Sequence, residues 1–310
     1  MVTQPRQYVA APTFTPASFG LLDALADVIR SPGDAHWRNG VNYEELCAAA
    51  DTTYDDCFAV SGSAGAAAAL PPGKTPTAGL ATRSATPFTV YADVDCSVPG
   101  FWDRAQLLVN QTMQRAEEHS VEQAFWTGLA AGQPVIYPHL AADTAVTEVR
   151  GGPHTYTLQT AATVITGTYD IVEGIGRLEA ALANCYDGVG VLHVPASLGT
   201  ALAESMLLVR DGNRYRTPNG NLIVLGGGYP GTSPAGVSSN DAVYVYATGA
   251  MFIYRSGIFT TPPVSAVDRQ VNTQNMIAER TYLLGWECCH LAVQITLGGV
   301  VAGASGGAGG

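Results

Sequence analysis

Charged residues are scarce in this chain. Asp, Glu, Lys and Arg make up 13% of its 310 residues, whereas they make up about 25% of a typical soluble domain. The chain has a single lysine, Lys74. A surface so poor in charge predicts that partner molecules cover much of it. A genome bias that enriches Ala, Gly and Arg would give the same composition, and the sequence leaves both explanations open.

Long apolar runs are also missing. No stretch reaches the roughly 18 residues that a membrane-spanning helix needs, and Met1–Arg6 lacks the pattern of a signal peptide. We therefore expect synthesis in the cytosol and no membrane partner. No CxxC pair occurs, and we expect the cysteines to be reduced and mostly buried. The six cysteines are Cys47, Cys57, Cys96, Cys185, Cys288 and Cys289.

Positive charge is too sparse for a nucleic-acid-binding surface. The formal net charge is −11, and tight binding of phosphate backbones needs clustered Lys and Arg. This net charge is still compatible with a container whose acidic inner wall faces nucleic acid without binding it tightly.

Catalytic motifs are absent as well. The sequence has no GxSxG, HExxH or CxxC, and Gly226–Gly228 lacks the spacing of a phosphate-binding loop, so we expect a turn with close backbone approach there. Adjacent residues of a strand point to opposite faces, so Cys288–His290 cannot easily converge on one metal ion. We interpret His193 as a core or interface histidine, and Glu117 and Glu118 as a solvated face or intersubunit pairs. The sequence thus predicts no catalytic residue, no metal and no cofactor.

The most informative stretch is 87–128. Apolar and polar residues alternate from Phe88 to Val94, which predicts a half-buried strand. Residues 101–127 contain no Pro or Gly, and apolar residues recur there at three- and four-residue spacings up to Gly128. A helix of that length is roughly 40 Å long, and it suits a brace in a flat, extended subunit.

The N-terminal third has weaker signals. Residues 1–20 contain three prolines and few charges, and we expect an extended segment that is disordered or lies along a neighbour. Short helices are predicted at 19–30 and 43–50. Residues 62–87 are rich in Gly, Ala, Pro, Ser and Thr, so with strands predicted around 56–60 and 88–94 they suggest a long two-stranded excursion whose tip is near Lys74.

The remaining chain alternates helix and strand. Helices are predicted at 170–184 and 195–207 and buried strands at 189–194 and 222–225. Short strands are expected at 133–137 and 155–158, hairpins at 208–216 and 241–254, two long final strands at 275–284 and 289–297, and a glycine-rich tail at 298–310.

Several stretches between 87 and 297 together resemble the major capsid proteins of tailed bacteriophages with the HK97-type fold, especially phages of actinobacteria. They are FTVYADVDCSVPG with the helix ending EQAFWTG, GVGVLHVPASLGTAL, LLVRDGNRYRTPNGNLIVLGGGYPG, YVYATGAMFIYRSG and NTQNMIAERTYLLGWECCHLAVQI. No single motif is diagnostic, but the ordered combination is fairly specific.

The resemblance implies an α+β fold with named parts. These are an N-terminal arm (1–55), an extended loop (56–96), a peripheral domain (97–169 and 263–297) with a spine helix (101–127), an axial domain (170–262) and a C-terminal tail (298–310). It also implies self-assembly into hexamers and pentamers of an icosahedral shell that encloses double-stranded DNA in a virion assembled in the host cytoplasm. Decoration, scaffold and portal proteins would be further partners.

Some capsids of this family join a loop lysine to an asparagine of a neighbouring subunit, with a glutamate taking the proton. By that resemblance Lys74 would be the donor, Asn272 or Asn275 the acceptor and Glu279 the base. The alternative, which we favour, is that Lys74 is an exposed charge and that the other three cap or solvate strand ends, since a fold does not imply a chemistry.

Two other functions compete with a viral shell. An encapsulin-like nanocompartment shell has the same fold and would enclose a cargo enzyme, and the sequence alone does not separate the two. A soluble α/β enzyme built on residues 170–262 would lack any assembled catalytic motif and leaves the long brace unexplained.

Overall fold

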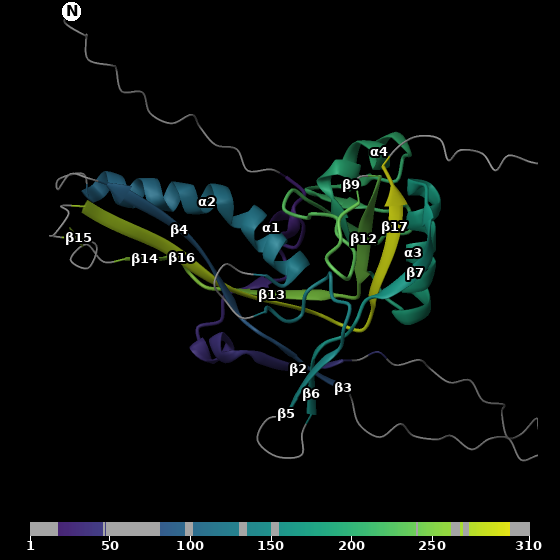
Figure 1. Ribbon diagram of the computed structural model, residues 1–310, viewed down its shortest axis with the longest axis horizontal. Coiled ribbons are helices and arrows are strands. Elements are labelled where there is room, and N and C mark those ends of the chain that lie inside the picture. The colour runs from purple at the N-terminus through teal and green to yellow at the C-terminus, as the bar shows by residue number, and fades with distance from the viewer. Residues whose placement is uncertain are drawn as a thin grey trace, which may run out of the picture.

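The computed structural model describes residues 18–45, 47, 81–96, 102–129, 135–149, 155–239, 241–261, 267–268 and 273–297. They form an elongated molecule with three sheets (Figure 1). Helix α2 (Trp102–Thr127) lies along one limb, and a compact unit around β12 (Ala242–Thr248) and β17 (His290–Thr296) forms the other end. The predicted mixture of helices and strands is confirmed.

A six-stranded sheet supports α2. Its longest strands are β4 (Phe88–Cys96) and β16 (Thr273–Trp286), which pair antiparallel from Phe88 opposite Tyr282 to Cys96 opposite Gln274. The other strands are β1 (Ile29–Arg30), β13 (Met251–Arg255), β14 (Phe259–Thr260) and β15 (Val267–Asp268).

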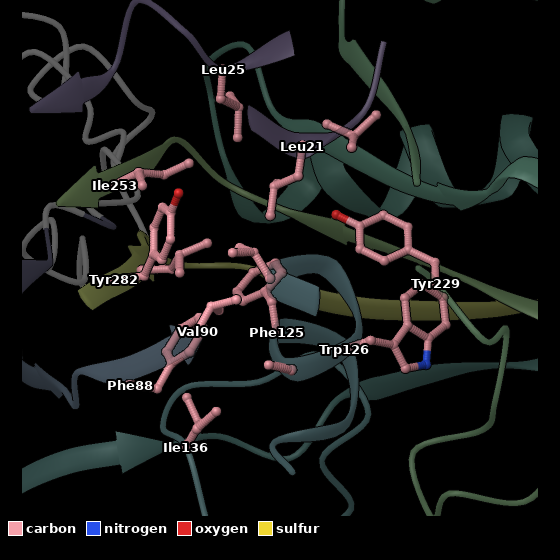
Figure 2. Close-up of a cluster of buried hydrophobic side chains, with 14 of the residues drawn as sticks. Leu21, Leu25, Phe88, Val90, Phe125, Trp126, Ile136, Tyr229, Ile253 and Tyr282 are labelled. Atoms are coloured by element: carbon pink, nitrogen blue, oxygen red, sulfur yellow. The ribbon is translucent and has the colours of Figure 1, made fainter. Parts of the chain in front are cut away.

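The predicted long helix is confirmed. Ala105, Val109, Met113, Val121 and Phe125 are buried at multiples of four residues, so one face of α2 packs on β4 and β16. Figure 2 shows Phe125 and Trp126 among side chains from the sheet and the N-terminal segment. The helix ends at Gly128, whose φ of 69° favours glycine.

The compact unit is a seven-stranded sheet covered on one face by α3 (Ile171–Cys185). The Asp170 carboxylate caps α3 by accepting from the amides of Val172 and Glu173. The strand order is β7 (Thr163–Tyr169), β17, β12, β8 (Val191–Pro195), β11 (Leu222–Gly226), β10 (Arg214–Arg216) and β9 (Val209–Asp211). The predicted helix at 195–207 is a 3-10 turn, η2 (Ala196–Leu198), followed by α4 (Gly199–Glu204).

A four-stranded sheet lies where the two larger units meet (Figure 1). It contains β2 (Val41–Glu45), β3 (Ala81–Ala85), β6 (Thr155–Gln159) and β5 (Val146–Val149). The helix predicted over 43–50 is therefore wrong at its start, because Tyr43 and Glu45 pair with β3. The helix predicted over 19–30 is reduced to α1 (Leu21–Ala24), and η1 (Ala35–Asn39) follows β1.

Strand pairing departs from the sequence prediction at the turn after β12. The segments 242–248 and 251–255 do not form a hairpin, because β12 pairs with β8 and β17 while β13 pairs with β1 and β16. The final strands part in the same way, since β16 lies in the six-stranded sheet and β17 in the seven-stranded one. The chain therefore crosses between the two sheets at both turns. The division into arm, loop, peripheral and axial domains stays a prediction.

Some predicted elements are absent or outside the described residues. The predicted strand at 133–137 is not formed in its described part, 135–137. The strand around 56–60 and the excursion tip at Lys74 lie outside the described residues. Among the described helices, none is long and apolar enough to cross a membrane.

Candidate functional site

The predicted cross-link residues are described only in part. Lys74 and Asn272 lie outside the described residues. Asn275 is exposed on β16 and Glu279 is partly exposed, on the face opposite to the buried Met276 and Ala278. Four residues of strand separate Asn275 from Glu279 by about 13 Å. The two residues lie on the same face of β16, and the cross-link hypothesis stays a prediction.

Glu117 and Glu118 do not form the solvated face expected from the sequence. Glu117 is buried on α2, and its Oε1 accepts hydrogen bonds from Arg280 Nη1 at 2.5 Å and from the Tyr282 hydroxyl. Glu118 Oε1 accepts from the amides of Leu22 and Asp23, at 3.0 and 3.4 Å. Both carboxylates therefore tie α2 to other parts of the same chain, so the solvated face is wrong, whereas intersubunit pairs stay a prediction.

Glu122 completes this row of carboxylates. Its Oε1 accepts from the Leu21 amide at 2.8 Å and its Oε2 from the Gly228 amide at 2.7 Å. Burial raises its pKa to about 7, although these backbone donors oppose the rise. One side chain thus joins the N-terminal segment, α2 and the loop after β11.

The glycines of that loop are explained by close packing. A Cβ atom on Gly228 would collide with the carbonyl oxygen of His119 on α2, and one on Gly226 would collide with the ring of Tyr229. The prediction of a turn with close backbone approach at 226–228 is confirmed.

His193 is a satisfied core histidine, as predicted. It is fully buried on β8, and its ring nitrogens lie 3.1 Å from the hydroxyls of Tyr229 and Thr248, each of which can donate or accept. Burial lowers its pKa to about 3. His290 differs, because its two nitrogens face the carbonyl oxygens of Thr160 and Leu140, at 3.0 and 2.7 Å. A neutral imidazole has one N–H, so it can donate to one of them at a time.

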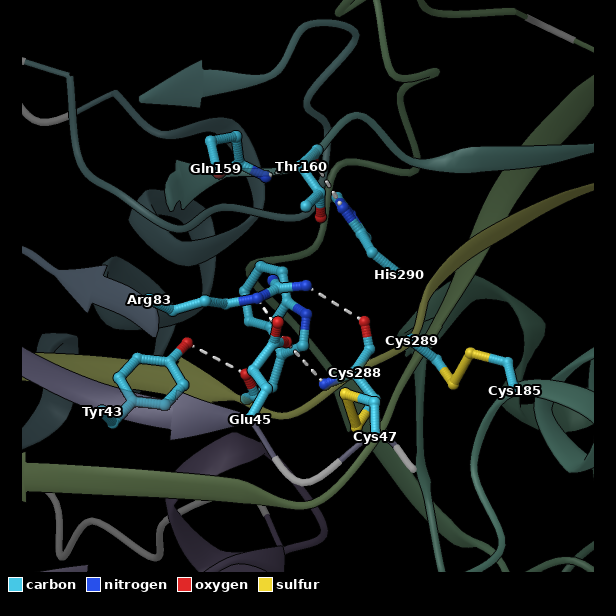
Figure 3. A network of polar contacts seen from close by, with 11 residues as sticks. Tyr43, Glu45, Cys47, Arg83, Gln159, Thr160, Cys185, Cys288, Cys289 and His290 are labelled. Carbon is cyan, nitrogen blue, oxygen red and sulfur yellow. Dashed lines mark hydrogen bonds and ion pairs between the residues drawn. A yellow bond between two sulfur atoms is a disulfide. The ribbon is translucent and has the colours of Figure 1, made fainter. Parts of the chain in front are cut away.

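Four cysteines are paired, which corrects the expectation that they are reduced. Disulfides join Cys47 to Cys288 and Cys185 to Cys289, with Cα atoms 5.3 and 5.9 Å apart (Figure 3). The two bonds bridge 241 and 104 positions of sequence. The pairing was missed because cysteines so far apart carry no spacing signal.

A buried ion pair lies beside these disulfides. Glu45 of β2 and Arg83 of β3 are both buried and in contact through their charged groups. Glu45 Oε1 also accepts from the Cys288 amide at 2.9 Å, and Arg83 Nη2 donates to the Cys288 carbonyl oxygen at 3.1 Å. The turn between β16 and β17 is thus held by side chains of the four-stranded sheet as well as by sulfur (Figure 3).

Metal-binding chemistry finds no support in the described part of the chain, where no group of three or more His, Cys, Asp or Glu could hold an ion. The carboxylates of α2 and of β2 face backbone amides, an arginine or a tyrosine hydroxyl. Their arrangement is that of structural anchors.

Comparison with known proteins finds similar structures but no similar sequence family. No family model matches the chain, and no curated protein matches it. Solved structures do match: the capsid of an empty GTA particle has 10% sequence identity and a TM-score of 0.52 over 95% of each chain. A structure from Mycobacterium phage Adephagia has 16% identity and a TM-score of 0.50, again over 95% of each chain. The chain has a capsid-protein fold.

This capsid fold agrees with the resemblance seen in the sequence. The capsid of the native GTA particle gives the same result, with 11% identity and a TM-score of 0.50 over 95% of each chain. The mixed α/β architecture fits the predicted HK97-like class. At these identities the likeness is one of fold, and function needs its own argument.

Proposed function

We propose that this chain is the major capsid protein of a tailed bacteriophage, with a structural and not a catalytic role. In this proposal it self-assembles into hexamers and pentamers of an icosahedral shell that encloses double-stranded DNA. The observation that carries the proposal is the match to capsid structures over 95% of the chain, brace and compact unit together. An enzyme built on the seven-stranded sheet alone would leave α2 and its sheet without a role.

The domain layout is part of this proposal. Residues 1–55 would be the arm, 56–96 the extended loop and 101–127 the spine helix. The compact sheet would surround the centre of each hexamer or pentamer, and β17 would belong with it because of its pairing with β12. Decoration, scaffold and portal proteins would be additional partners.

Negative-stain microscopy of the purified chain tests the function directly. We expect closed shells of uniform size, alone or with a co-expressed scaffold. Persistent monomers under both conditions would contradict the proposal. Shells recovered from the native host should hold DNA, whereas a packed enzyme would identify a nanocompartment instead.

The shell would hold DNA without specific binding. The net charge of −11 per chain gives unfavourable long-range electrostatics toward phosphates. We expect free subunits to show no measurable affinity for duplex DNA at physiological salt, as measured by fluorescence anisotropy. Micromolar or tighter binding would contradict this part of the proposal.

A further inference from the structure

The two disulfides share one design. Each joins an outer cysteine to an inner one: Cys47 and Cys185 are exposed, while Cys288 is partly buried and Cys289 is buried. Cys288 and Cys289 are neighbours in the turn between β16 and β17, and their side chains diverge toward different partners (Figure 3).

These bonds meet where three sheets join. Cys47 follows the end of β2, Cys185 ends α3 on the seven-stranded sheet, and the turn at 288–289 connects the six- and seven-stranded sheets. Glu45 and Arg83 also bind the Cys288 backbone, so contacts other than the disulfides hold this turn. We therefore expect the inner sulfurs to face their partners in the reduced chain as well.

We propose that these cysteines form two oxidisable pairs, with the outer cysteine of each as the entry point for a low-molecular-weight disulfide and the inner one as the resolving thiol. In a reducing cytoplasm the chain carries four thiols, because disulfides there are rare. In oxidising surroundings it carries two disulfides. The inference concerns the single chain and does not depend on shell assembly.

The chemistry balances at each pair. The outer cysteine loses its proton to solvent, and its thiolate attacks one sulfur of the small disulfide, releasing one small thiolate. The mixed disulfide sits on the exposed sulfur. The inner cysteine then loses its proton and attacks that outer sulfur, forming the Cys–Cys bond and releasing the second small thiolate. The chain gives up two electrons and two protons per pair, and the small disulfide becomes two thiols.

The order follows from access. A small disulfide reaches the exposed Cys47 and Cys185, whereas the buried Cys289 and the partly buried Cys288 are shielded by the turn and its neighbours. Removing an inner cysteine should therefore leave the small molecule trapped on the outer one, and removing an outer cysteine should leave the inner thiol unmodified.

Trapping with oxidised glutathione tests this order. The full-length chain carries Cys57→Ser and Cys96→Ser, which remove the two remaining cysteines, and is mapped by peptide mass spectrometry. We expect two disulfides in this parent, glutathione retained on Cys47 after Cys288→Ser, and glutathione on Cys185 after Cys289→Ser. In the matched Cys47→Ser and Cys185→Ser variants, glutathione labelling of the inner cysteine should be about tenfold lower than labelling of the outer cysteine in the Cys288→Ser and Cys289→Ser variants. Equal labelling of inner and outer cysteines, other pairings, or no oxidation of the parent would each overturn the proposal.

Thermal unfolding supplies a second measurement. Bonds that close such long loops should raise the melting temperature of the oxidised parent by about 10 °C over the reduced one. The single variants Cys47→Ser and Cys185→Ser each keep one bond and should show part of this rise. Equal melting temperatures of oxidised and reduced parent would overturn the proposal.

Discussion

At the scale of single residues, Glu117 shows how a charge can hold a core position. It lies four residues after Met113 and four before Val121, on the buried face of α2. Glu117→Gln should lower the free energy of unfolding by about 3 kcal/mol, because Arg280 would stay mostly buried without its counter-charge. Chemical denaturation of the full chain measures this. Glu173→Gln, which breaks the exposed pair with Arg177 on α3, is the control and should leave the midpoint unchanged. Equal midpoints for both variants would contradict the prediction.

As the pH falls, the buried histidines lower the stability of the folded chain, whereas the buried Glu122 raises it. The pKa of His193 falls to about 3 and that of His290 to about 4 through burial, so the unfolded chain binds protons first and stability is lost as the pH falls below about 6.5. The raised pKa of Glu122, about 7, means that the native chain binds its proton first, which adds stability between pH 7 and about 4.5.

Melting temperatures between pH 7 and 4.5 test both effects. We expect a net fall with acid, a shallower fall in His193→Gln and a steeper one in Glu122→Gln. The wild-type profile is the reference for both slopes. A His193→Gln profile parallel to the wild type would show that His193 does not take part in the acid response.

At the scale of the elements, α2 must remain continuous to brace the six-stranded sheet. Ala116 is exposed near its centre, so substitution there tests the backbone without changing the core. Ala116→Pro removes a helix hydrogen bond and should cost about 3 kcal/mol or more. Under the proposed function, it should also prevent assembly. Ala116→Ser keeps the amide and is the control in both denaturation and microscopy. Normal stability of the proline variant would mean that α2 tolerates a break.

At the scale of the whole molecule, a lysine–asparagine cross-link between subunits would have to use Lys74, since it is the only lysine and the chain terminus is the only other amine. We expect no cross-link and therefore a single band near the chain mass of 32.2 kDa when boiled, reduced particles are run on a denaturing gel. Reduction removes disulfides, so any ladder must come from another bond. A ladder that disappears in Lys74→Arg would establish the cross-link and refute our expectation.

The local sequence predicted correctly those elements in which apolar residues recur with a clear helical or strand period. The helix at 101–127 has no internal Pro or Gly and a continuous apolar face, and the strand at 88–94 alternates cleanly, so both could be predicted without knowing their distant partners. The helix predicted over 43–50 failed for the opposite reason. Tyr43 and Glu45 form a strand because β3 offers a partner and Arg83 offers a charge, both far along the chain.

By itself, the sequence determined the long brace, the alternating helices and strands that follow it, the resemblance to phage capsid proteins and the buried role of His193. Only the tertiary structure decided that neighbouring strands such as β12 and β13, or β16 and β17, belong to different sheets. It also decided that Glu117, Glu118 and Glu122 anchor α2, and that Cys47 and Cys185 meet adjacent cysteines. The physical reason is sequence distance: periodicity records which face of an element is buried, whereas strand pairing, side-chain anchoring and disulfide formation depend on partners far along the chain that a local pattern does not contain.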